Sequence, residues 1–169
     1  MAILDIIEFY DQSGEVMVAK FPQDGSSAIA NGSQLVVQET QLAYIYRDGQ
    51  ALDEFGPGRH DITTPNIPML AALQGLPYGF RSPFRCHVCY VSTKVFTNLG
   101  WGTSSPILFR DSEFRMVTLR AFGVFAIAIR EPRTFLNTLV GSKGLETTYA
   151  IEQYFKTHIV ATLNEVLAN

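Results

Sequence analysis

The sequence predicts an α+β fold in which a β-rich segment precedes a helical one. Residues 15–130 show apolar–polar alternation and turn signals, whereas apolar residues recur every three or four positions from 131 to 169. Hydrophobic residues make up 47% of the 169 residues and charged residues 17%, a balance typical of chains that bury a core. One compact domain with a helical extension is therefore expected.

Three segments are expected along the chain. Residues 1–14 form an N-terminal amphipathic segment, in which Asp5, Glu8 and Asp11 share one face of a helix. Residues 15–144 form the β-rich domain with short helices, and residues 145–169 form a C-terminal helix. Because no Gly or Pro ends that helix, we expect it to continue beyond the last residue into a longer helical region or coiled coil.

Short strands joined by tight turns are predicted in the first half of the β-rich domain. The expected strands cover residues 15–21, 34–38, 41–47, 50–55 and 59–63. Asp48-Gly49 is a strong hairpin signal, and Gly56-Pro57-Gly58 predicts a sharp corner. The stretch 65–83 is expected to be irregular, with at most one short helix at 68–74.

Longer elements are predicted in the second half. Strands are expected at 84–93 and 106–110, with a loop at 99–105 that contains Gly100-Trp101-Gly102. Phe114–Arg130 is the longest strand signal, and its odd-numbered residues from 117 to 129 carry no polar side chain. Because these 17 residues would span about 55 Å, a bend at Gly123 is expected. Helices follow at 131–140 and 145–167, the second apolar at Ile151, Phe155, Ile159, Leu163 and Val166.

Charge is distributed unevenly along the chain. Residues 1–80 hold three basic and ten acidic side chains, residues 81–133 hold eight and three, and residues 134–169 hold two and three. Either the fold interleaves these blocks, or the acidic face of one copy attracts the basic face of the next, head to tail. The overall charge of −3 is too mild to indicate nucleic-acid binding as the main task.

Motifs for catalysis or metal binding are weak in this sequence. Cys86-His87-Val88-Cys89 looks like half of a metal site, but its two cysteines point to opposite faces of a strand, so buried or half-buried thiols are expected. Asp111-Ser112-Glu113 predicts a solvated turn. The sequence contains no recognisable nucleophile, phosphate-binding or dinucleotide-binding motif, so we expect no catalytic residue, no cofactor and no metal.

Two apolar segments are candidates for contact with a membrane or a partner. The charge-free stretch 67–80, followed by Arg81, either folds over the core or faces a lipid interface or a neighbouring subunit. The N-terminal apolar stripe offers the same alternatives. The candidate contact residues are Ile3, Leu4, Ile7, Ile67, Met69, Leu70, Leu73, Leu76, Tyr78, Phe80 and Arg81. A secretory signal and an apolar span of 18 residues are both absent from this sequence, which predicts a cytosolic location.

Several segments resemble the SPFH domain of the stomatin/prohibitin/flotillin (Band 7) family. The residues that match the opening hairpin of that domain are Arg47, Gly49, Gly56, Pro57, Gly58, His60 and Pro65. Farther along, residues 95–103, 109–113 and 120–123 resemble a bacterial subgroup whose members are labelled virion-core-like.

The resemblance implies a twisted antiparallel β-sheet with helices packed on it, and a scaffold that is not an enzyme. It further implies homo-oligomers, formed through regions partly outside this chain, at a membrane surface or on membrane proteins. The expected place is peripheral, at the inner face of the cell membrane in a lipid microdomain, where the subgroup recruits membrane-stress proteins of the phage-shock type. The alternative is a soluble partner-binding or ligand-binding module without a membrane role.

Overall fold

The computed structural model describes residues 6–23, 27–28, 32–47, 50–62, 85–141 and 147–168. The chain divides into two compact units: Met1–Lys94 with Ile129–Thr147, and Val95–Ala128 with Thr148–Asn169. This division differs from the expected boundaries at 14 and 144. The difference arises because residues 95–128 pair among themselves and pack against the C-terminal helix rather than joining the sheets of the first unit.

A three-stranded sheet in the order β1-β4-β7 forms one layer of the first unit. It contains β1 (Ile6–Glu8), β4 (Ser33–Val37) and β7 (Gly58–Ile62). β1 pairs with β4 in parallel and β7 pairs with β4 antiparallel. The helix expected at the N-terminus is therefore wrong for residues 6–8, because backbone pairing with β4 places them in a strand.

The second layer of the first unit is an antiparallel sheet in the order β2-β8-β5-β6. Its strands are β2 (Val18–Phe21), β8 (Arg85–Ser92), β5 (Gln41–Arg47) and β6 (Gln50–Phe55), and the short β3 (Ser27–Ala28) also pairs with β8. The bounds of β5 and β6 match the predicted strands, and Arg47 pairs with Gln50 as a hairpin requires. The Asp48-Gly49 turn itself lies outside the described residues.

The core of the first unit lies between these two sheets. Side chains from alternate positions of both sheets meet there, as expected for strands with one inward face: Ile7, Leu35, Val37 and Ile62 from the first, and Ala43, Ile45, Val88 and Tyr90 from the second. A helical segment, α2 (Pro132–Phe135) continued by the π-helical turn η2 (Leu136–Gly141), packs against β6. The predicted start of this helix at a proline is confirmed, with Pro132 in its first turn.

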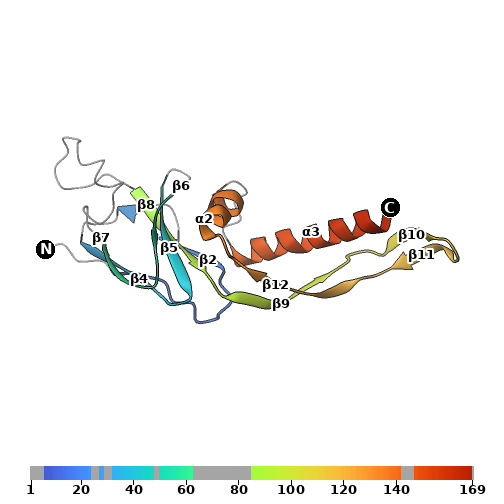
Figure 1. Ribbon diagram of the computed structural model, residues 1–169, viewed down its shortest axis with the longest axis horizontal. Coiled ribbons are helices and arrows are strands. Elements are labelled where there is room, and N and C mark those ends of the chain that lie inside the picture. The colour runs from blue at the N-terminus through green and yellow to red at the C-terminus, as the bar shows by residue number, and fades with distance from the viewer. Residues whose placement is uncertain are drawn as a thin grey trace. The chain divides into compact units, whose positions relative to one another are not determined.

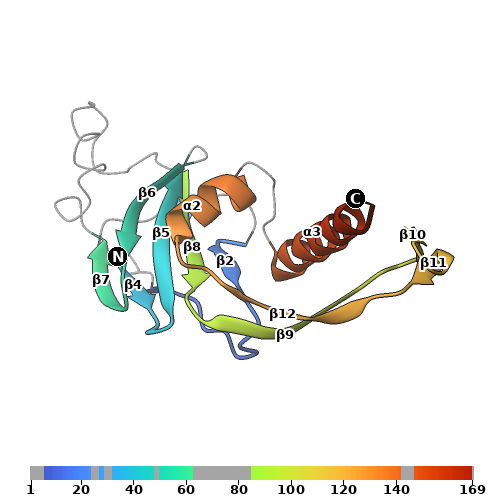
Figure 2. The same cartoon turned by 45° about the vertical axis from the view of Figure 1, so that its right-hand side comes forward.

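A long two-stranded ribbon, residues 95–128, forms the sheet of the second unit (Figure 1). β9 (Val95–Gly102) pairs with β12 (Phe122–Ala128), and β10 (Ile107–Asp111) pairs with β11 (Arg115–Leu119), both antiparallel. The two ladders are linked because the Thr103 N–H donates to the Ala121 carbonyl at 2.9 Å. The C-terminal helix α3 (Thr148–Ala168) runs along one side of the ribbon and packs against β9 and β10 (Figures 1 and 2).

The Gly100-Trp101-Gly102 segment is the clearest correction to the predicted elements. It continues β9 instead of forming a loop, since Trp101 pairs with Gly123 and Gly102 with Phe122. A Cβ added at Gly123 would lie 2.9 Å from Trp101 Nε1, so only glycine leaves room for the indole there. The long strand signal is interrupted between Leu119 and Phe122, just before the predicted bend at Gly123.

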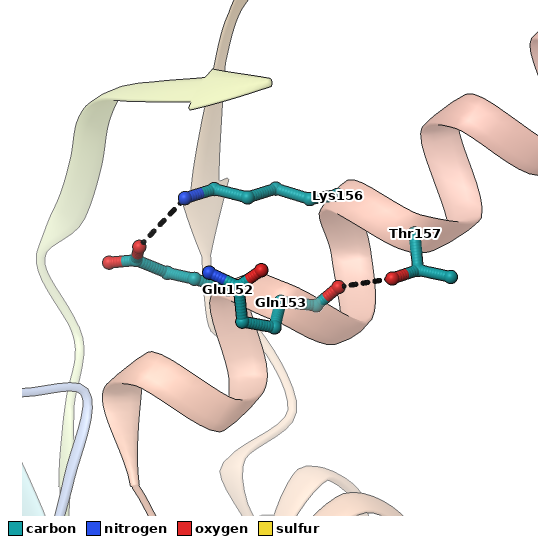
Figure 3. Close-up of polar contacts among 4 residues, drawn as sticks. All are labelled: Glu152, Gln153, Lys156 and Thr157. Carbon is teal, nitrogen blue, oxygen red and sulfur yellow. Dashed lines mark hydrogen bonds and ion pairs between the residues drawn. The ribbon is translucent and has the colours of Figure 1, made fainter. Parts of the chain in front are cut away.

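α3 begins at Thr148, three residues after the predicted start. Its second turn contains an ion pair between Lys156 Nζ and Glu152 Oε2 at 3.4 Å, and the Thr157 hydroxyl donates to the Gln153 carbonyl at 2.9 Å (Figure 3). Such an i,i+4 pair on a partly exposed surface contributes about 0.3–0.5 kcal/mol. The predicted apolar face is confirmed where Ile151 is buried and Phe155, Ile159 and Leu163 are half-buried, but Val166 is 66% exposed.

Candidate interaction surfaces

The ribbon has two chemically distinct faces because its side chains alternate. Odd-numbered residues from 117 to 127 are half-buried, and their partners on β9 and β10 are half-buried or, at Phe96, buried. This inner face confirms the predicted apolar stripe and contains Leu99, Trp101, Phe109, Val117, Leu119, Phe125 and Ile127.

The opposite, outer face of the ribbon is exposed and largely apolar. Its five large apolar side chains have exposed fractions between 55% and 87%: Val95, Leu108, Met116, Phe122 and Val124. Along residues 108–128 its charged members are Arg110 and Arg120, both basic and exposed. Carboxylates appear only in the turn at the ribbon tip, where Asp111 and Glu113 lie. An exposed patch of this kind is typical of an interaction surface.

The outer face of the ribbon was not predicted as a contact surface from the sequence. The signal was present: Met116, Phe122 and Val124 alternate with the fully apolar odd-numbered stripe. A strand that is apolar on both faces is normally covered on both faces. α3 packs against β9 and β10 within this unit, and the outer face stays exposed.

The ribbon tip matches the predicted solvated turn. Asp111 Oδ1 accepts hydrogen bonds from the backbone N–H groups of Phe114 at 2.8 Å and Glu113 at 2.9 Å. These two bonds stabilise the ionised carboxylate and lower the pKa of Asp111. Asp111 therefore acts as a turn-forming residue, since both bonds close the tip between β10 and β11.

The N-terminal contact prediction divides between exposed and buried residues. Ile7 is 2% exposed and belongs to the core, so it does not offer its side chain to a membrane or partner. Its neighbours Ile6 and Tyr10 are 55% and 69% exposed. The Tyr90 hydroxyl donates to the Ile7 carbonyl at 3.1 Å, which ties β1 to β8. Ile3 and Leu4 lie outside the described residues.

The second predicted contact segment also lies outside the described residues. This holds for the possible helix at 68–74 and for all eight of its contact candidates: Ile67, Met69, Leu70, Leu73, Leu76, Tyr78, Phe80 and Arg81. Their role as contacts remains a prediction.

The structure explains the Gly56-Pro57-Gly58 corner, which is among the residues that resemble the SPFH domain. Gly58 has a φ of +124°, a conformation that a residue with a Cβ rarely adopts. The His60 ring nitrogen Nε2 lies 2.7 Å from the Gly56 carbonyl oxygen, and the ring packs at 5.3 Å from that of Phe55. These contacts fix the turn between β6 and β7, so His60 has a structural part in the corner.

A small group of titratable side chains surrounds the β5–β6 ladder. The Tyr44 hydroxyl donates to Glu54 Oε2 at 2.8 Å; burial, this bond and the Glu54 charge together raise the pKa of Tyr44. Burial also raises the pKa of Asp53, although the positive charge of Arg133 opposes the effect. Tyr44 is 1% exposed, which places its hydroxyl within the packed unit. We interpret the group as a support for the fold.

The Cys86–Cys89 segment forms part of β8. Cys89 is a buried thiol, as predicted, and the side chain of Cys86 is not described. The His87 ring packs against Tyr46, its cross-strand partner, with ring centroids 5.0 Å apart. Among the described residues, no cluster of three or more His, Cys, Asp or Glu side chains could hold a metal ion.

Among the helices that the structure describes, none is both long enough and apolar enough to cross a bilayer.

Comparison with known proteins places these features in a family. The chain is 27% identical over 171 residues to YdjI, an uncharacterized protein of Bacillus subtilis (strain 168), with 98% of this chain covered. The chain spans 49% of the length of that relative. A search of solved structures gives no significant match. The family model described as SPFH domain-Band 7 family matches residues 18–169, and the chain therefore belongs to the SPFH domain–Band 7 family.

Proposed function

We propose that this chain is a non-catalytic SPFH domain that serves as a scaffold and oligomerisation module at the inner face of a bacterial cell membrane. The family match over residues 18–169 supports a scaffold-type domain. The observation that carries the proposal is the outer face of the ribbon, because an exposed apolar surface suits binding to other molecules. SPFH proteins are often associated with membranes, which favours a peripheral location.

The membrane contact is proposed to involve the apolar stretch 67–80, with Arg81 near anionic headgroups. The test is co-sedimentation of the full-length protein with vesicles that contain phosphatidylglycerol. The combined Leu70→Asp and Leu73→Asp substitutions should reduce the bound fraction, because two carboxylates oppose insertion among lipids. The combined Gln23→Asp and Thr93→Asp substitutions, at exposed positions in the first unit, add the same two negative charges as a control and should bind like the wild type. Unchanged binding of the Leu70/Leu73 variant would exclude this stretch as the contact.

The finer proposal is that the full-length protein brings membrane-stress proteins of the phage-shock type to the membrane. It rests on the resemblance of residues 95–103, 109–113 and 120–123 to the virion-core-like subgroup. In cells, deletion of the gene should disperse a fluorescently tagged phage-shock protein from membrane foci, and the wild-type gene should restore the foci. Foci that persist after deletion would contradict recruitment. A protein that ignores vesicles and still binds a soluble partner would favour the alternative, a soluble binding module.

A further inference from the structure

The outer face of the ribbon is apolar and exclusively basic along its strands. Phe122 and Val124 are 87% and 69% exposed, and Arg120 lies two positions before Phe122 on the same face. Two such faces cannot pair with each other favourably, because the same arginines would meet across the contact. A partner for this face needs apolar side chains and carboxylates.

The N-terminal segment of the same chain carries that complementary chemistry. Ile6 and Tyr10 are exposed apolar side chains, and Glu8 is exposed on the same side of β1 as Ile6. Asp11 and Glu15 follow, and the sequence has no Lys or Arg before Lys20. The segment is therefore apolar and exclusively acidic.

The position of β1 adds a second feature. β1 is the outermost strand of its sheet, since among the described strands it pairs with β4 alone. A strand at a sheet edge is accessible along one side and is prone to contact another chain. The nearest basic residue on that sheet face, Arg59, lies two strands away and donates a hydrogen bond to Gln34.

We propose that the outer face of the ribbon in one copy docks on the N-terminal segment of a second copy. Phe122 and Val124 would pack against Ile6 and Tyr10, with Arg120 facing Glu8. The contact is head to tail, so a pair of copies still has one free ribbon face and one free N-terminal segment, and repetition closes a ring or extends a filament. This assignment rests on the proposed scaffold function and names the two surfaces through which copies assemble.

A charge swap tests the assignment. Sedimentation velocity of the full chain at low salt should show concentration-dependent association. Arg120→Glu and Glu8→Arg should each raise the apparent Kd of self-association about tenfold, because each substitution places like charges together. The double variant should return to within about threefold of the wild type, because the pair is restored with reversed polarity. Phe122→Ser should also weaken association, since the side chain is almost fully exposed in a single copy.

Matched controls separate specific contacts from net charge. Lys94→Glu and Glu39→Arg alter exposed positions by the same charge and should leave the Kd unchanged. Circular dichroism and Trp101 fluorescence should show that all variants remain folded.

Four outcomes would overturn the assignment. A wild type that stays monomeric at every concentration would refute it, and so would single swaps that leave association unchanged or a double variant that fails to recover. The fourth is loss of binding to phosphatidylglycerol vesicles in Arg120→Glu without any change in self-association, which would assign the face to lipid. Because vesicle binding through residues 67–80 is measured separately, the membrane proposal can succeed or fail independently.

Discussion

Gly123→Ala tests the packing of the ribbon at the point where it differs most from the sequence expectation. The added Cβ would lie 2.9 Å from Trp101 Nε1, 3.3 Å from Cε2 and 3.5 Å from Cζ2. Carbon contacts are normally about 3.5–4.0 Å long, so the indole has to move. Overpacking of this kind costs about 1–3 kcal/mol, and alanine recovers about 0.5–1 kcal/mol of backbone entropy relative to glycine. The free energy of unfolding of the second unit should fall by about 0.5–2 kcal/mol.

Gly100→Ala is the matched control on the partner strand. A Cβ at Gly100 meets nothing within 4 Å, so this variant should gain about 0.5–1 kcal/mol. Trp101 is the protein's single tryptophan, so its fluorescence during urea denaturation reports on the ribbon directly. Circular dichroism follows both units and would reveal separate transitions.

Stability in urea and the Trp101 emission maximum together can refute the proposed packing of the indole over Gly123. If Gly123→Ala is as stable as Gly100→Ala and its emission maximum is unchanged, the indole does not pack over Gly123. A double-mutant cycle with Trp101→Leu, followed by circular dichroism, gives an independent measure. The cost of Gly123→Ala should largely vanish in the Trp101→Leu background, because the clash is with the ring.

Three further predictions concern single residues. Tyr90→Phe should lower the free energy of unfolding of the first unit by about 1 kcal/mol, because the Ile7 carbonyl loses its donor; hydrogen exchange at β1 should accelerate, and unchanged exchange would contradict the tie. Asn98, at a φ of +61° beside the β9–β12 register shift, should tolerate Gly, whereas Val should cost about 1–2 kcal/mol in urea denaturation; equal stability of both variants would refute the strain. Asp53→Asn should raise the melting temperature at pH 7 and leave it nearly unchanged near pH 3. Burial raises the pKa of Asp53 in the folded state. The contribution of Asp53 to the free energy of unfolding is therefore greatest below the ordinary aspartate pKa and falls as pH rises through the raised value. A lower melting temperature of Asp53→Asn at pH 7 would contradict this sign.

Local signals predicted the elements whose causes are local. β5 and β6 were predicted to the residue, because the Asp48-Gly49 dipeptide is a strong hairpin signal in the sequence between the two strands. The start of α2 at Pro132 followed from the same kind of signal. In each case the determining residues lie within a few positions of the element.

Distant partners decided the elements that were predicted wrongly. The pattern of residues 1–14 favoured a helix, but Ile6–Glu8 pairs with Gln34–Val36, and the hydroxyl of Tyr90 binds the Ile7 carbonyl. Gly100 and Gly102 indicated a loop, yet β12 supplies the cross-strand partners that keep them in β9. Sequence periodicity contains no information on such pairings, which is why Ile7 was predicted as a contact residue instead of a core residue.

The outer face of the ribbon links these energetic arguments to function. An isolated two-stranded ribbon is marginally stable in water, so it needs apolar cover. α3 packs against β9 and β10, and the odd-numbered residues, including Phe125 and Ile127, are half-buried. Phe122 and Val124 add nothing to that cover and increase the exposed apolar surface. Thr or Lys at these two positions would expose less apolar surface to water. The apolar side chains found there, and the arginines beside them, therefore favour an external partner. If that partner is a second copy, the protein has its lowest solubility as a single copy and gains burial with each copy added.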